Sequence, residues 1–116
     1  EADPVIGRLR WTSPSAAFFV SAHTNEIDVP INAAYAERKL TPTMVTFAVD
    51  GRVFHKLGLT ASGWSTLRLR VPPPLVRGHQ YRRVDITTEP PWSPAAVLGI
   101  HDSRVLGVQL GDVVAR

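Results

Sequence analysis

Apolar and polar residues alternate with a period of two through most of this chain, and no other feature of the sequence constrains its fold as strongly. Successive side chains of a β-strand point to opposite faces, so a strand that is buried on one face carries this alternation. Proline, glycine and Asp-Gly signals interrupt it roughly every 8–12 residues, a spacing typical of β-sandwiches and β-barrels. We therefore expect about seven or eight strands. They are predicted at residues 6–12, 16–22, 26–32, 44–60 (a hairpin), 63–71, 80–88 and 105–114.

The expected fold is all-β, because the chain shows no β-α-β unit and no internal repeat. Its 116 residues suit a single domain, residues 1–116, that is large enough to bury a core without disulfides. A single antiparallel β-sandwich of the jelly-roll type is the leading topology, and an immunoglobulin-like sandwich is the alternative. Since the chain begins at Glu1 rather than at a methionine, we expect a mature or excised segment.

The hairpin over residues 44–60 has Asp50-Gly51 at its tip, a pair that favours the positive φ of tight turns. A two-residue loop is one possible register. A three-residue loop starting at Val49, with Gly51 left-handed, is preferred because it gathers more apolar side chains on one face and turns His55 inward. The side chains gathered in that register are Val45, Phe47, Val53 and Leu57.

The strand over residues 26–32 contains Pro30 between the apolar Val29 and Ile31. Proline has no N–H to donate to a neighbouring strand, so it is favoured on edge strands. We therefore expect an edge strand, or an outward backbone position, at Pro30.

The chain carries 13 basic and 10 acidic residues, for a net charge of +3. Its arginines are scattered rather than clustered in a run, so we do not expect a nucleic-acid binder. No apolar run reaches the roughly 18 residues of a membrane span, so no membrane insertion is expected.

No sequence pattern indicates a metal, a cofactor or a catalytic nucleophile. The chain has no cysteine, and its four histidines lie far apart without metal-ligand spacing. Nucleophile elbows and glycine-rich phosphate loops are also missing. Most acidic residues fall at turns or on charged faces, so binding is favoured over cleavage, although paired carboxylates for glycoside hydrolysis are not excluded by the sequence.

Three aromatic residues are candidates for sugar stacking. Trp64 alternates in phase with Arg68, Tyr81 alternates in phase with Arg83 and Asp85, and Trp92 lies in a proline-rich loop. An outward ring can stack on the C–H groups of a pyranose while charged side chains bond its hydroxyls. The predicted ligand-binding set is Trp92, Tyr81, Trp64, Arg83, Asp85 and Arg68. The alternative for Trp64 and Trp92 is that each closes one end of the sandwich as part of the core.

Four short motifs carry a resemblance to a known kind of domain. They are Val49-Asp50-Gly51-Arg52-Val53, Gly63-Trp64, Trp92-Ser93-Pro94 and Asp102-Ser103-Arg104-Val105-Leu106-Gly107-Val108. From roughly Thr43 to Val114 the chain resembles the carbohydrate-binding-module-like β-sandwich domains appended to bacterial cell-envelope glycosyltransferases and polysaccharide-assembly proteins. Those domains commonly end with a Trp/Phe-x-Pro loop and an Asp-x-Arg-x-Leu-Gly strand.

The outward aromatics and the resemblance together predict a non-catalytic polysaccharide- or oligosaccharide-binding module. The resemblance implies an extracellular or periplasmic location in a bacterium and a covalently linked catalytic domain as a partner. A structural accessory domain that packs against a partner enzyme domain is the alternative. A small polysaccharide-active enzyme is the third hypothesis.

Overall fold

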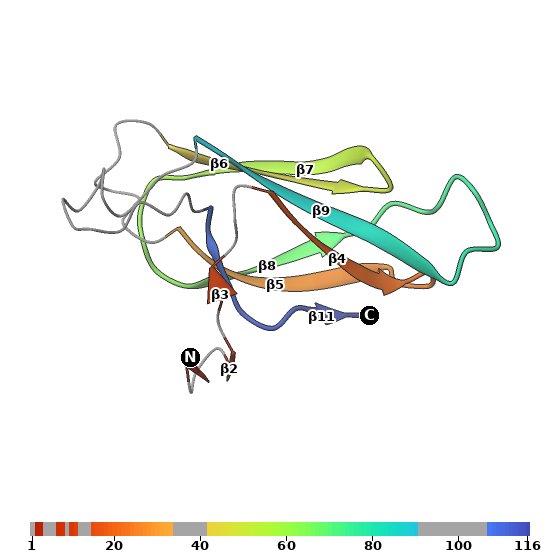
Figure 1. Cartoon of the computed structure of the whole chain (residues 1–116), viewed down its shortest axis with the longest axis horizontal. Helices are drawn as coiled ribbons and strands as arrows, with labels where there is room; N and C mark the ends of the chain where they lie inside the picture. Colours follow the sequence, from red (N-terminus) through yellow and green to blue (C-terminus); the bar gives the residue numbers. More distant parts are fainter. Residues whose placement is uncertain (1, 4–6, 9, 12–14, 34–41, 91–106) are drawn as a thin grey trace.

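The computed structural model describes residues 2–3, 7–8, 10–11, 15–33, 42–90 and 107–116 (Figure 1). Within these ranges all regular structure is β-strand. The strands are β1 (Ala2–Asp3), β2 (Gly7–Arg8), β3 (Arg10–Trp11), β4 (Ser15–Ser21), β5 (Glu26–Asn32), β6 (Thr43–Val49), β7 (Arg52–Leu59), β8 (Ser65–Arg70), β9 (Tyr81–Glu89), β10 (Gln109–Leu110) and β11 (Val114–Ala115).

Two antiparallel sheets face one another in a β-sandwich, as the sequence predicts (Figure 1). One sheet has the order β4-β9-β6-β7. In the other, β5 lies between β8 and the consecutive strands β10 and β11, and β3 pairs with β10. With β10 and β11 taken as one interrupted strand, the chain crosses between the sheets in the order of a jelly roll. The short β1–β2 pair forms a sheet of its own.

The core fills the space between the two sheets, and the alternation in the sequence supplies it. In β5, β6 and β9, every second side chain is buried and the residues between them are at least partly exposed. Phe47 has the largest of the fully buried side chains. The buried apolar residues are Val20, Ile27, Val29, Ile31, Ala33, Val45, Phe47, Val49, Leu69, Val71, Val84, Ile86, Val108 and Leu110.

The β6–β7 hairpin turns through two residues, so the prediction of a three-residue loop is wrong. Val49 pairs with Arg52, and Asp50 and Gly51 both have positive φ, at 50° and 83°. This is the twist-matched geometry that Asp-Gly favours. The left-handed conformation expected of Gly51 is confirmed.

A β-bulge restores the hydrophobic register beyond this turn. The pairing shifts between Phe47 and Ala48, so Phe54 has no partner across the hairpin and Phe47 lies opposite His55. The rings of Phe54 and His55 then lie 6.3 Å and 6.2 Å from the ring of Phe47. Val53 pairs with Ala48 and is exposed, contrary to the expectation that it faces the core.

Pro30 lies in a central strand rather than the edge strand that its missing donor suggests. β5 pairs with β8 on one side and with β10 and β11 on the other. The carbonyl of Pro30 accepts a hydrogen bond from Gly111 N at 2.9 Å, so its nitrogen faces the break between β10 and β11. The absent N–H therefore falls where the neighbouring strand is interrupted.

Replacing Gly51 by valine is expected to lower the free energy of unfolding by about 1–2 kcal/mol, because a β-branched residue rarely adopts positive φ. An added Cβ would meet no atom within 4 Å, so the cost is conformational rather than steric. Urea unfolding measures the change. Gly51→Asn is the matched control, since asparagine tolerates the left-handed conformation. Equal losses in both variants would contradict this explanation.

Candidate functional site

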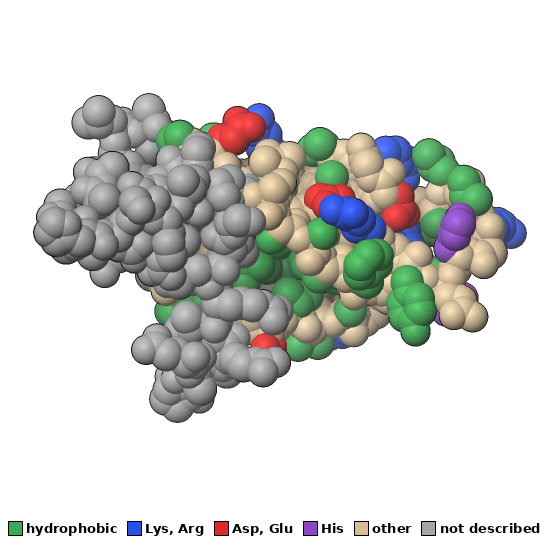
Figure 2. Space-filling view, viewed as in Figure 1, with side chains coloured by type: hydrophobic (Ala, Val, Ile, Leu, Met, Phe, Trp, Pro, Cys, Tyr) green, Lys and Arg blue, Asp and Glu red, His purple; other side chains and the backbone are tan. Residues whose placement is uncertain are grey.

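Three connections between strands meet at one end of the sandwich and line a cleft of about 940 Å³. They are the β4–β5 turn, the β6–β7 turn and the loop from residue 71 to residue 80 between β8 and β9. We call this the loop end; it lies on the right of Figure 1. Hydrophobic, basic and histidine side chains gather there (Figure 2). The cleft continues onto the outer face of β4 and β9.

Two aromatic side chains project from that outer face. Tyr81 is 66% exposed and Phe19 is 68% exposed, and both line the cleft. In the β4–β9 register, Tyr81 lies opposite Ser21, and Phe19 lies opposite Arg83. The two rings are therefore diagonal neighbours on one face, a separation of roughly 7–8 Å between backbone positions.

An ion pair continues the same row along β9. Arg83 Nε lies 2.9 Å from Asp85 Oδ1, and the arginine side chain is well exposed. Arg83 and Asp85 are two residues apart on an extended strand, so their side chains leave the sheet on the same side. The outer face of β9 thus carries an aromatic ring, a cation and a carboxylate in a row, from Tyr81 through Arg83 to Asp85.

The opposite face of β9 supports the loop end through a buried arginine. The Arg82 side chain is 3% exposed and is paired with Asp50, with 2.9 Å between Nε and Oδ2. Its Nη1 also donates to the carbonyl of Pro72 at 2.6 Å. The second carboxylate oxygen of Asp50 accepts from Arg83 N at 3.2 Å. One guanidinium therefore joins β9, the hairpin tip and the start of the β8–β9 loop.

These hydrogen bonds lower the pKa of the Asp50 carboxyl group. The hydrogen bond from Arg82 is the main cause that lowers the pKa of Asp50, and the backbone bond from Arg83 adds to it. Burial alone would raise this pKa, but its effect is smaller than that of the Arg82 hydrogen bond. Asp50 is therefore a carboxylate at neutral pH, as a partner for a buried cation must be.

The six residues predicted to bind sugar do not gather in one place. Tyr81, Arg83 and Asp85 come together beside the cleft. Trp64 precedes β8 at the opposite end of the sandwich and is half-buried. Trp92 lies outside the described residues.

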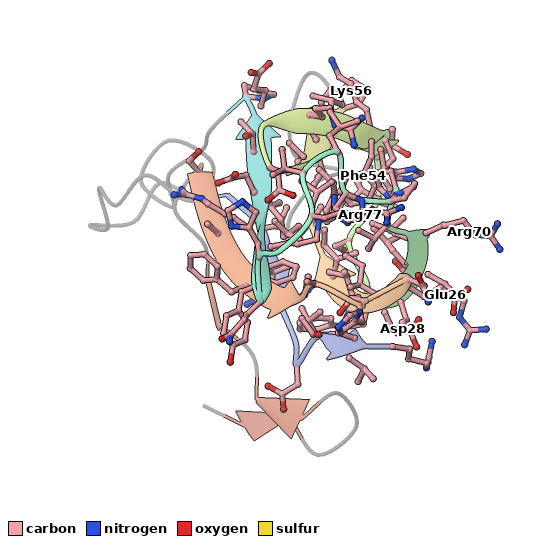
Figure 3. The ribbon with its side chains drawn as sticks, turned by 90° about the vertical axis from the view of Figure 1, so that its right-hand side faces the viewer. Glu26, Asp28, Phe54, Lys56, Arg70 and Arg77 are labelled. Atoms are coloured by element: carbon pink, nitrogen blue, oxygen red, sulfur yellow. The ribbon has the colours of Figure 1, made fainter. Side chains whose placement is uncertain are left out.

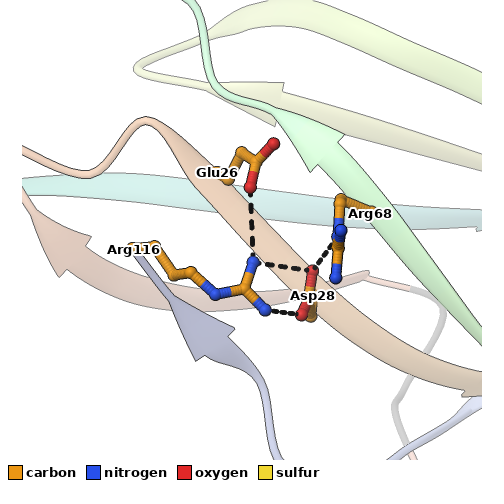
Figure 4. Close-up of polar contacts among 4 residues, drawn as sticks. All are labelled: Glu26, Asp28, Arg68 and Arg116. Carbon is orange, nitrogen blue, oxygen red and sulfur yellow. Dashed lines mark hydrogen bonds and ion pairs between the residues drawn. The ribbon is translucent and has the colours of Figure 1, made fainter.

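Arg68 is exposed on the outer face of the other sheet, where it takes part in an ion-pair cluster (Figure 4). Its Nε lies 3.2 Å from Asp28 Oδ1, and Arg116 contacts both Asp28 and Glu26. The bond from Arg116 is the main cause that lowers the pKa of Asp28. The cluster joins β5 to β8 and to the last residue of the chain. Arg68 therefore belongs to a structural contact on a different surface from Tyr81.

Most residues of the loop end were not among the predicted site residues, and Phe19 and Arg82 show why. Phe19 lies outward because its strand neighbours Phe18 and Val20 pack inward. All three residues are apolar, so the sequence does not show which of them face the core. Arg82 has the same parity as Val84 and Ile86, so the alternation of β9 already marks it as inward. The inward position of Arg82 could therefore have been predicted from the sequence.

Comparison with known proteins supports the fold of this chain and nothing about its function. The chain is similar to part of latent PorU from Porphyromonas gingivalis, whose crystal structure is described as dimeric, with a TM-score of 0.52 and 11% identity. The match covers 95% of this chain and 10% of that one, so the chain spans about a tenth of its length. No family model matches the chain, and no curated protein is significantly similar in sequence.

The described part of the chain holds no group of three or more histidine, aspartate or glutamate side chains placed to bind a metal ion. It also has no helix that is long and apolar enough to cross a bilayer.

Asp50→Asn is expected to lower the free energy of unfolding by about 1–3 kcal/mol, because it removes the charge paired with the buried Arg82 guanidinium. Asp85→Asn is the matched control. Its partner Arg83 is exposed, so the loss is expected to stay within about 0.5 kcal/mol. Urea unfolding of both variants measures the difference, and similar losses would contradict a special role for Arg82.

Acid is expected to destabilise the fold through Asp50 and Asp28, whose folded pKa values are both lowered. The unfolded carboxyl groups, with pKa values of about 3.9, take up protons before the folded ones do. Their stabilising contribution is therefore complete above that pKa and is lost as pH falls through it toward the lower folded values. Melting temperatures measured from about pH 6 to pH 2 should fall less steeply in the Asp28→Asn, Asp50→Asn double variant. Parallel curves would refute this assignment.

Proposed function

We propose that this chain is a non-catalytic carbohydrate-binding module that holds an oligosaccharide at the loop end, across the outer face of β4 and β9. The proposal depends on one observation: Phe19 and Tyr81 are neighbours on adjacent strands, and about two-thirds of each side chain is exposed. Exposed ring surface is favourable to cover with an apolar partner. The C–H face of a pyranose is such a partner, and its flat shape suits an aromatic ring.

The polar groups beside the rings suit sugar hydroxyls, which both donate and accept hydrogen bonds. The Arg83 guanidinium can donate to a hydroxyl, and the Asp85 carboxylate can accept from one. Their mutual bond uses Nε and Oδ1, which leaves other nitrogens and the second oxygen without partners in the described part of the chain. The pair is thus already oriented for a ligand that lies along β9.

Rigid support of the rings favours binding. β4 and β9 pair over seven consecutive residues, from Ser15 opposite Thr87 to Ser21 opposite Tyr81. A ring on such a strand loses little freedom when a ligand covers it, so more of the contact energy appears as affinity. A single sugar–ring contact of this kind contributes about 1–2 kcal/mol, or roughly tenfold in affinity.

The resemblance in the sequence extends the proposal to the context of the domain. We infer a module that is covalently attached to a catalytic domain and works in the extracellular or periplasmic space of a bacterium. The structural neighbour is compatible with a role as one part of a longer chain, since the shared fold is about a tenth of that protein.

Docking against a partner domain is the second candidate function. Leu75, which is 77% exposed, and Val76 project from the β8–β9 loop at the same end as Phe19 and Tyr81. Exposed apolar side chains gathered in one region are typical of protein interaction surfaces. This role would need no affinity for polysaccharide in the isolated chain, so sugar binding separates the two functions.

Affinity gel electrophoresis in gels cast with soluble polysaccharides tests the proposal. The chain is expected to be retarded by at least one polymer of a panel of neutral and acidic polysaccharides. Phe19→Ala and Tyr81→Ala are each expected to weaken retardation about tenfold, because each removes one stacking surface. Both side chains are exposed, so the melting temperature should change little.

Val114→Ala is the matched control, since Val114 is an exposed apolar residue on β11 of the other sheet. Its retardation should equal that of the unmodified chain. Failure of every polysaccharide in the panel to retard the chain would refute the binding-module proposal and favour the docking role.

A further inference from the structure

The cleft at the loop end concentrates the positive charge of the molecule. Four arginines and one aspartate are among the described residues that line it, a formal charge of +3 when its two histidines are neutral. The whole chain also carries a net charge of +3, so the remainder is close to neutral. A hollow of one sign attracts ligands of the opposite sign and raises their local concentration.

Two of these arginines have no carboxylate partner among the described residues. Arg52 donates from Nη2 to the carbonyl of Pro73 at 3.3 Å, which holds it at the rim without neutralising it. Arg77 is exposed, and Figure 3, which faces the loop end, shows it near the middle, between the two sheets. A guanidinium offers a planar fork of donors that binds a carboxylate through two parallel hydrogen bonds.

Arg82 lies behind them as a buried cation. Its Nε and Nη1 are bonded to Asp50 and Pro72, whereas its buried Nη2 has no hydrogen-bond partner in the part of the chain that the structure describes. Asp50 is the one carboxylate among the cleft residues described, and it is already bound to Arg82. Asp85, beside the cleft, is paired with Arg83, so Arg52 and Arg77 are the lining arginines without a carboxylate partner in the described part of the chain.

We propose that the carbohydrate held in this cleft is acidic, with a uronic acid as the recognised unit. One sugar ring would cover Tyr81 and Phe19, while the carboxylate of a uronic acid further along the same oligosaccharide is bound by Arg77 and Arg52, on the side of the cleft formed by the β8–β9 loop and the hairpin. This inference rests on the proposed function, because it specifies the ligand class of the same site. The aromatic rings explain why a sugar binds, and the arginines select a charged one.

Polygalacturonate and alginate are suitable probes, each compared with its carboxyl-reduced form, which keeps the backbone but is neutral. The folded chain is expected to be retarded by at least one uronate polymer and not by the corresponding reduced polymer. Arg77→Gln and Arg52→Gln are each expected to raise the apparent Kd about fivefold to tenfold, because each removes a charge-assisted contact. Thermal melts of all variants check that they remain folded.

Arg70→Gln is the matched control, because Arg70 is an exposed arginine of β8 that projects away from Arg77 in Figure 3. It is expected to bind like the unmodified chain, and an equal loss in this variant would show that only overall charge matters. Poly-glutamate, a polyanion without sugar rings, should not compete at equal carboxylate concentration. Effective competition would overturn the proposal in favour of a general polyanion surface.

The remaining outcomes separate this inference from the proposed function. Equal or stronger retardation by the carboxyl-reduced polymers, or by neutral polysaccharides alone, would overturn the acidic specificity and leave the sugar module intact. Absence of retardation by every polymer, neutral or acidic, would overturn both. Retardation by a uronate that survives Arg52→Gln and Arg77→Gln together would place the acidic sugar elsewhere on the chain.

Discussion

The guanidinium of Arg82 occupies the row of β9 that faces the core, at the point where Val84 and Ile86 begin to fill the sandwich. A cation in that position needs a counter-charge and hydrogen-bond acceptors, because the interior screens charge poorly and offers no water. Asp50 and the carbonyl of Pro72 supply them from the hairpin tip and the β8–β9 loop. These bonds tie the β8–β9 loop and the hairpin tip to β9, and the loop and the tip both line the cleft.

One face of β9 supports the fold, and the other carries the row of side chains proposed to bind a ligand. Inward residues anchor the core and the loop end, whereas Tyr81, Arg83 and Asp85 form an outward row. Because successive residues of a strand alternate sides, each residue of this outward row lies next to an inward residue that anchors the backbone. A site built on such a strand is more rigid than one built on loops, and the basic β8–β9 loop then borders it on one side.

Particular elements show where the alternation was informative and where it failed. It predicted the inward rows of β5 and β9 because both are regular over their whole length. It failed in β7, where a single unpaired residue, Phe54, reverses the phase, so that Val53 faces outward although His55 faces Phe47. A bulge is a property of two paired strands, so a pattern within one strand does not reveal it. The edge-strand alternative for Pro30 failed for the same reason: a proline is tolerated in this central strand because of the break between β10 and β11.

The sequence by itself determined the all-β class, most strand positions, the left-handed Gly51 and the outward direction of Tyr81, Arg83 and Asp85. These follow from local rules, namely the two-residue repeat of a strand and the conformational preferences of turn residues. Tertiary structure alone decided which outward residues meet. Arg68 and Tyr81 share the same sequence pattern, yet they lie on different sheets, and Phe19 joins Tyr81 only through the β4–β9 pairing. A binding site depends on such long-range neighbours, which strand periodicity does not encode.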